Sequence, residues 1–183
     1  MNSYCMSQSV GVGGNFNRGM SDKLVCHNPI RMEHMRKGKV IGVYDCLNDI
    51  TNEGKNLIFD VMFNNTTQIA NNSWFIGLIS LSSFSALAAG DTMSSHGGWT
   101  EFTSYSQSTR VAWGSGASSG QSVTNATPAQ FDINGSGTVK GVLITSVSTK
   151  SGTTGKLWAT ALFGADVPVT NGDQLKITYT VSA

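Results

Sequence analysis

A serine flanked by glycines is the first feature of the sequence that could carry out a reaction. Gly116-Ala117-Ser118-Ser119-Gly120 fits the G-x-S-x-G pattern of serine hydrolases, and His96-Gly97-Gly98 is similar to an oxyanion loop. A nucleophile elbow requires a strand before the serine, a helix after it and a histidine later in the chain. Here a Gly/Ser-rich loop leads into a predicted strand, and no histidine follows His96. We interpret the match as chance and predict that the protein is not an enzyme.

Paired acids and metal ligands give equally weak signals. Glu101 and Asp132 are the candidates for a glycosidase pair, but nothing in their spacing marks them as partners, and we expect both on strand surfaces. Cys26, His27 and His34 lie close in the sequence without C-x-x-C or H-x-x-x-H spacing. The sequence therefore predicts no catalytic residue, no cofactor and no metal site.

The cysteines also indicate where the protein is made. Cys5, Cys26 and Cys46 are an odd set near the N-terminal end, which favours free thiols in a reducing cytoplasm over a disulfide such as Cys5–Cys26. No signal peptide is visible, and the longest apolar run, residues 74–81, is too short to cross a bilayer. We expect a protein that neither enters the secretion pathway nor binds a membrane.

Four aromatic residues leave a binding function open. Trp99, Tyr105, Trp113 and Trp158 could stack on sugar rings, as in carbohydrate-binding modules, but aromatic residues spaced along strands more often fill the core. We therefore favour the core interpretation for all four.

Charge is sparse and nearly balanced. Charged residues make up 13% of the chain, and the formal net charge is +1, whereas a nucleic-acid-binding protein usually has a clear basic excess. The basic cluster consists of Arg31, Arg36, Lys37 and Lys39, interrupted by Glu33. It is either a solvated connector before the first strand, which we favour, or a patch for phosphate or an acidic partner. We predict no nucleic-acid partner.

Two segments differ in pattern and predict the organisation of the chain. Residues 1–37 are rich in glycine and polar residues, with no lasting period, and predict an extended or disordered N-terminal arm. Residues 38–183 predict one antiparallel β-sandwich or jelly-roll-like domain, so the fold class is mainly β. Helical spacing of apolar residues predicts one short helix over 52–63, and a helical turn or two is the alternative to a plain connector at 84–88.

Short apolar or alternating segments predict the strands of this domain. The run Trp74–Ile79 is typical of a central strand buried on both faces, and 173–182 alternates with a period of two. Glycine- and asparagine-rich turns separate the later strands. The predicted strands are 39–47, 74–79, 108–113, 121–125, 128–133, 138–146, 156–163 and 173–182.

Several motifs in order resemble a family of small structural proteins of tailed bacteriophages. They are WFIGLI at 74–79, AAGDTMSSHGGWTE at 88–101, TSYSQSTRVAW at 103–113, STKSGTTGKLW at 148–158 and NGDQLKITYT at 171–180. The resemblance covers roughly residues 39–183 and does not extend to the first 37 residues. It implies a component of the virion, synthesised in the host cytoplasm.

Within that family we favour a capsid decoration (cement) protein on the capsid exterior. The resemblance implies a non-enzymatic β-sandwich whose partners are the major capsid protein and other copies of itself, as a dimer or higher oligomer. Arg31, Arg36, Lys37 and Lys39 are the candidate capsid contacts, and the arm would add further contacts. The alternative is a tail- or fibre-associated module that binds host-surface carbohydrate, which would require Trp99, Tyr105 and Trp113 to line an exposed groove.

Overall fold

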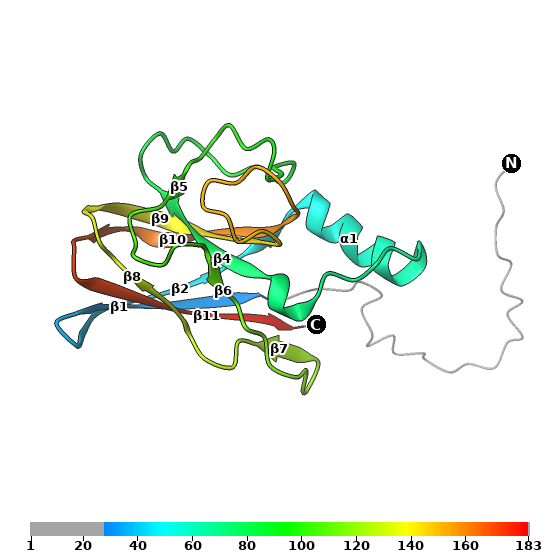
Figure 1. Cartoon of the computed structure of the whole chain (residues 1–183), viewed down its shortest axis with the longest axis horizontal. Coiled ribbons are helices and arrows are strands. Elements are labelled where there is room, and N and C mark those ends of the chain that lie inside the picture. The colour runs from blue at the N-terminus through cyan, green and yellow to red at the C-terminus, as the bar shows by residue number, and fades with distance from the viewer. Residues whose placement is uncertain (1–27, 183) are drawn as a thin grey trace, which may run out of the picture.

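Two antiparallel β-sheets enclose the core of the protein, and one α-helix lies at one end (Figure 1). This computed structural model describes residues 28–182. The predicted class, a mainly β antiparallel sandwich with one short helix, is confirmed. Side chains from both sheets form the larger of two hydrophobic clusters, so the sheets are held together by burial of their inner faces.

The first sheet joins the beginning of the described chain to its end. Its strand order is β2-β1-β11-β7, and β8 also pairs with β11. The register runs from Ile30 opposite Tyr179 to Arg36 opposite Asp173, so β1 lies between β2 and β11. The bounds of its strands are β1 (Pro29–Arg36), β2 (Lys39–Leu47), β7 (Ser122–Thr124), β8 (Ala129–Asp132) and β11 (Asp173–Ser182).

Strand β1 corrects the predicted boundary between arm and domain. Ile30, Met32 and His34 are buried on its inner side, with 1%, 0% and 3% of their surface exposed, while Arg31 points to solvent. This period-two pattern is that of a strand with one buried face. The domain therefore begins before residue 38, because residues 29–36 belong to the sheet. The rest of the predicted arm, residues 1–27, lies outside the described residues.

The second sheet has the order β3-β10-β9-β4-β5, and β6 pairs with β4. Strand β4 lies between β9 and the short β5 and β6, and five of its six residues are buried, as the apolar run at 74–79 predicts. The bounds of its strands are β3 (Asp49–Ile50), β4 (Phe75–Ser80), β5 (Glu101–Phe102), β6 (Val111–Ala112), β9 (Gly137–Thr145) and β10 (Leu157–Val169).

Helix α1 (Asn52–Phe63) forms where the sequence predicts it. The Thr51 hydroxyl caps its first turn by accepting a hydrogen bond from the Gly54 amide at 3.0 Å. Gly54 is the buried residue of α1, and the helix approaches β10 so closely there that a Cβ would collide with the carbonyl oxygen of Trp158. The far end of α1 extends away from the sheets (Figure 1). A single 3₁₀ turn, η1 (Asn71–Ser73), precedes β4, and no helix forms at 84–88.

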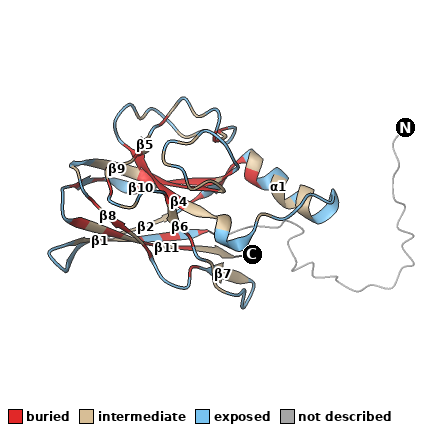
Figure 2. Ribbon diagram, viewed as in Figure 1, coloured by how far each residue is buried: buried red, intermediate tan, exposed pale blue. Residues whose placement is uncertain are grey.

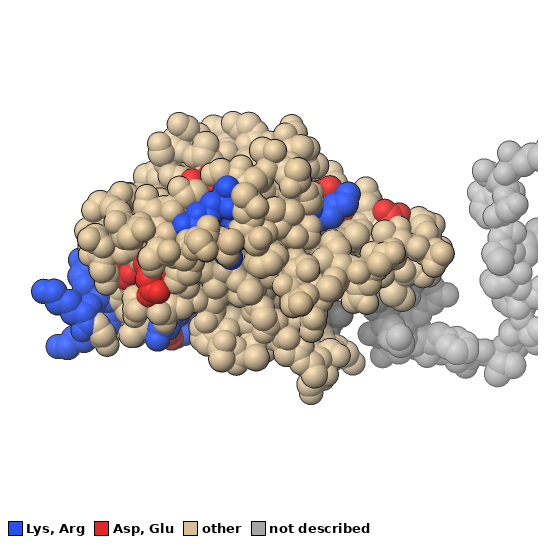
Figure 3. Space-filling view, viewed as in Figure 1, with Lys and Arg blue, Asp and Glu red and all other residues tan. Residues whose placement is uncertain are grey.

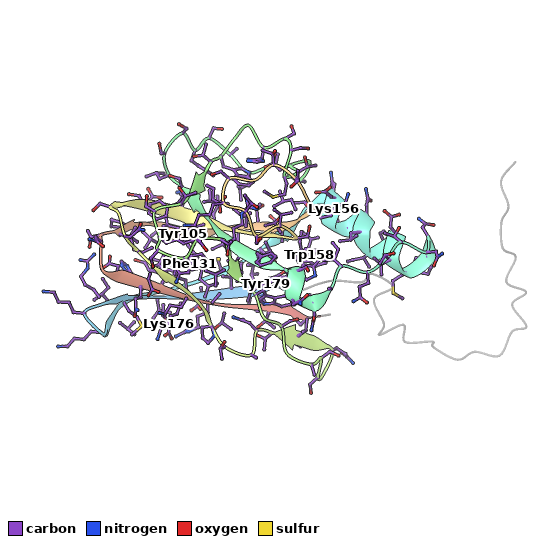
Figure 4. The ribbon with its side chains drawn as sticks, viewed as in Figure 1. Tyr105, Phe131, Lys156, Trp158, Lys176 and Tyr179 are labelled. Carbon is purple, nitrogen blue, oxygen red and sulfur yellow. The ribbon has the colours of Figure 1, made fainter. Side chains whose placement is uncertain are left out.

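Trp99, Tyr105 and Trp113 are buried, as predicted, whereas Trp158 is half-buried and packs against the edge of the core. Most of the buried residues lie on the strands, whereas α1 and the loops carry mainly exposed and intermediate residues (Figure 2). The Tyr105 ring meets Phe131 edge-on, with centroids 5.0 Å apart. The Trp158 indole donates a hydrogen bond to the Tyr179 hydroxyl at 2.7 Å, which satisfies a polar group that would be costly to bury unpaired (Figure 4).

Candidate functional site

The β1–β2 hairpin presents the predicted basic cluster at one end of the molecule. Arg36 pairs with Lys39, which leaves a two-residue turn of Lys37 and Gly38 with φ angles of 50° and 75°. Positive φ at both central residues is typical of the tight type I′ hairpin turn. Lysine and arginine side chains gather at this end of the molecule (Figure 3). The turn therefore holds Lys37 and Lys39 out into solvent.

The four predicted contact residues are not equivalent. The Arg31 guanidinium lies 3.2 Å from the Asp45 carboxylate, and Arg36 makes two hydrogen bonds to Asp173 at 2.7 and 2.8 Å. Both arginines are therefore partly neutralised by acids of their own sheet. For Lys37 and Lys39 we find no acidic group within ion-pair distance in residues 28–182. Both lysines are exposed to solvent.

A buried carboxylate anchors the base of the hairpin. Asp173 is 1% exposed and accepts hydrogen bonds from Arg36, from the His34 ring at 2.9 Å and from the Thr170 amide at 2.9 Å. The hydrogen bonds from Arg36 hold the pKa of the Asp173 carboxyl well below its usual range. The local sequence does not predict this role of Asp173, because its partners Arg36 and His34 lie 137 and 139 residues away.

Strand β2 adds an apolar surface to the basic tip. Eight large apolar side chains are exposed in the described part of the chain, and β2 carries four of them. Among residues 28–182, strand β2 pairs with β1 alone and forms the edge of its sheet. The four side chains, with their exposed fractions, are Val40 (51%), Ile41 (51%), Val43 (44%) and Leu47 (69%). An edge strand with such side chains is a ready site for association.

The serine motif lacks the geometry of a nucleophile elbow. Ser118 is exposed in the loop between β6 and β7, and a strand rather than a helix follows it. His96 stacks on the Trp99 ring at a centroid distance of 4.0 Å and lies within hydrogen-bond distance of the Thr92 carbonyl oxygen. Each residue has a local structural setting, and none of these contacts links Ser118 to His96.

The two candidate acids have separate structural partners, and one lies deeper than predicted. Glu101 is not on the surface: its side chain is 3% exposed and accepts two hydrogen bonds from Arg110, at 3.0 and 2.9 Å. Asp132 lies in the other sheet and is half-buried. It accepts hydrogen bonds from the side-chain amides of Gln107, Gln130 and Gln174. Neither carboxylate faces the other.

The residues considered as metal ligands are Cys26, His27 and His34. Cys26 and His27 lie outside the described residues, and His34 is engaged by Asp173. Residues 28–182 contain no group of three His, Cys, Asp or Glu side chains that could hold a metal ion. Burial raises the pKa of the Cys46 thiol to about 11, so this cysteine stays protonated at neutral pH.

Three of the four candidate aromatic residues are almost fully buried, whereas Trp158 is half-buried and lines a small pocket with Trp113 and Trp74. Trp99, Tyr105 and Trp113 are 2%, 1% and 8% exposed, and the Trp113 indole donates a hydrogen bond to the Tyr179 carbonyl oxygen. The exposed groove that a glycan-binding module would require is therefore not formed by these residues. Among the described residues, we also find no helix long and apolar enough to cross a membrane.

Comparison with known proteins adds no relative: no protein-family model matches the chain, and no curated protein sequence matches it.

Proposed function

We propose that the protein is a non-enzymatic virion component, a capsid decoration or cement protein that binds the outer face of the major capsid protein of a tailed phage. The observation that carries the proposal is the concentration of exposed aliphatic side chains on the edge strand β2, next to the free Lys37 and Lys39. A protein that works by adhesion needs such a surface. The sequence motifs that resemble phage structural proteins supply the identity of the partner.

The size of this surface fits binding to a repeating lattice. Full burial of a Val, Leu or Ile side chain is worth about 1.5–3 kcal/mol, so four half-exposed side chains offer about 3–6 kcal/mol per copy. The cost of association is about 4 kcal/mol or more, which leaves a single patch weak. Several patches held by one oligomer, on a shell that repeats its binding sites, raise the total affinity without new contacts.

The two lysines contribute orientation and rate more than affinity. Lys37 and Lys39 stand at the hairpin tip without an acidic neighbour in the described part of the chain, so an acidic rim on the capsid subunit would attract them at long range. The same attraction weakens as salt screens it. We therefore expect the association rate to fall as ionic strength rises, while the dissociation rate, which depends on the apolar contacts of β2, changes little.

Phage heads that lack the protein provide the test. Heads built from the major capsid protein of the same genome are mixed with purified protein and sedimented. We expect the protein to sediment with heads, and the double substitution Val43→Asp with Leu47→Asp to lower its affinity about tenfold or more, because charges would be buried on contact.

Matched surface charges control for a general effect of acidity. Thr153 and Thr154 are exposed in the loop between β9 and β10, and the double substitution Thr153→Asp with Thr154→Asp adds the same charge there. We expect this variant to bind as the natural chain does. Natural protein that stays in the supernatant, or that associates with purified tails instead of heads, contradicts the proposal.

A further inference from the structure

Helix α1 carries an apolar stripe that no described residue covers. Phe59, Met62 and Phe63 share one face of the helix and are 55%, 68% and 76% exposed. The rings of Phe59 and Phe63 stack with centroids 6.5 Å apart. Two phenylalanines and a methionine left in water on one short helix are unfavourable, because each would gain free energy on burial. A segment that covered the stripe would therefore be stabilised by burial of these side chains.

The chain enters the described structure beside this stripe. A pocket of about 300 Å³ lies along α1, and its lining includes Ile58 and Phe59 of the helix together with Asn28, the first described residue. The 27 residues that precede Asn28 are therefore joined to the described chain at this pocket. Asn28 and Phe59, which belongs to the stripe, therefore line the same pocket.

A hydrogen-bond acceptor without a partner among the described residues lies beside the same pocket. Asn48 also lines it and is 7% exposed; its Nδ2 donates to the Tyr179 hydroxyl, but its Oδ1 is buried without a donor among the described residues. A buried acceptor without a partner is costly. The backbone N–H of a polypeptide segment that enters the pocket is a suitable donor, whereas a purely apolar ligand would leave Oδ1 unpaired.

The residues just before Asn28 have the right composition and reach. Leu24 and Val25 are adjacent apolar residues in a polar stretch. The four residues from Leu24 to Asn28 can span about 13 Å when extended. The helix from Lys55, which lines the pocket, to Phe63 is about 12 Å long at 1.5 Å per residue. Leu24 can therefore reach the far end of the stripe.

We propose that Leu24 and Val25 of the same chain dock on Phe59, Met62 and Phe63, with the backbone before Asn28 seated in the pocket and donating to Asn48. Chain continuity favours this occupant over a second copy, because the segment is already tethered at the pocket and binds at a high effective concentration. The proposal is independent of the capsid function, since it concerns how the domain covers its own helix.

Thiol reactivity tests the coverage directly. In a Met62→Cys chain, the rate of reaction with a water-soluble maleimide is followed by mass spectrometry of the peptide that carries residue 62. We expect the rate to rise about tenfold when Leu24→Asp and Val25→Asp are added, because protection by docking is lost. Val43→Cys on β2 is the control: Val43 is 44% exposed and lies on a strand outside the stripe, so its rate should not change.

Two further measurements decide between occupants. Over about a hundredfold dilution, protection by the chain's own segment stays constant, whereas protection by a second copy falls and overturns the proposal. Hydrogen exchange of the α1 amides, with and without the Leu24→Asp and Val25→Asp changes but without the added cysteine, repeats the comparison on an intact stripe. Equal rates with and without the changes, in both measurements, also overturn it.

Discussion

Removal of the negative charge of Asp173 is the sharpest test of how the hairpin is anchored. Asp173→Asn keeps the shape of the side chain but not its charge. The Arg36 side chain is 42% exposed and can be solvated in the variant, so loss of its ion pair with Asp173 should lower the free energy of unfolding by less than about 1 kcal/mol. The His34 ring and the Thr170 amide are left with a weaker acceptor, and a hydrogen bond to a charged group is worth about 1.5–3 kcal/mol.

The expected loss in the free energy of unfolding is therefore about 3 kcal/mol at pH 7, which corresponds to a fall in Tm of about 6–12 °C for a domain of this size. The change is measured by urea denaturation followed by circular dichroism, with calorimetry for Tm. Asp166→Asn is the matched control, because Asp166 forms an exposed ion pair with Lys140 and should cost less than about 1 kcal/mol.

The same variant makes a prediction about pH. The folded-state pKa of Asp173 is lowered, so its stabilising contribution is fully present well above the unfolded pKa of about 3.9 and is lost as the pH falls through the folded pKa. The amide that replaces this carboxyl in the variant does not titrate. The gap between the two proteins should therefore be widest at neutral pH and narrow below about pH 4. A gap that is the same at pH 7 and pH 3, or a loss no larger than that of the control, would refute the reasoning.

Two other substitutions test the buried parts of the fold. Glu101→Gln leaves the Arg110 guanidinium, which is 1% exposed, without its charge partner, and should lower the free energy of unfolding by about 3–5 kcal/mol in urea denaturation. The control Glu33→Gln removes a surface charge and should change that free energy very little. Equal losses in the two variants would contradict a buried ion pair. Gly54→Ala should lower Tm in calorimetry, because the added Cβ would press on the Trp158 carbonyl oxygen. This loss should exceed the gain of about 1 kcal/mol from the higher helix propensity of alanine. A higher Tm would show instead that α1 can move away from β10.

Local patterns are sufficient to predict much of the architecture. The helix begins and ends at the predicted residues, and the strands from β7 to β11 lie within a few residues of their predicted ranges except that β10 runs on to Val169. In β11, Leu175, Ile177 and Tyr179 are buried as the period of two indicates. These elements could be predicted because glycine- and asparagine-rich turns separate them and each carries its own hydrophobic period.

The parts that could not be predicted depend on partners distant in the sequence. Residues 29–36 alternate between buried and exposed positions, but a histidine at a buried position and basic residues at exposed ones obscure the pattern in the sequence. The burial of His34 is stabilised by its hydrogen bond to Asp173, which is distant in the sequence. The basic cluster is visible in the sequence, but its favoured interpretation as a connector before the first strand is wrong, because Arg31 and Arg36 lie on β1. That Arg31 and Arg36 are held by Asp45 and Asp173 follows from strand pairing, which the local sequence does not encode.

The pairing of β1 with β11 has a consequence for biosynthesis. His34 and Asp173 meet across 139 residues, so on the ribosome the β1–β2 hairpin emerges long before the strand that covers its other side. Until then Ile30 and Met32 lack their final neighbours, and the nascent chain exposes an unpaired strand. Such non-local closure slows folding and leaves time for chains to associate wrongly. A chaperone that shields the nascent hairpin should therefore raise the yield of folded protein, whereas slower translation, which prolongs the exposure, should lower it.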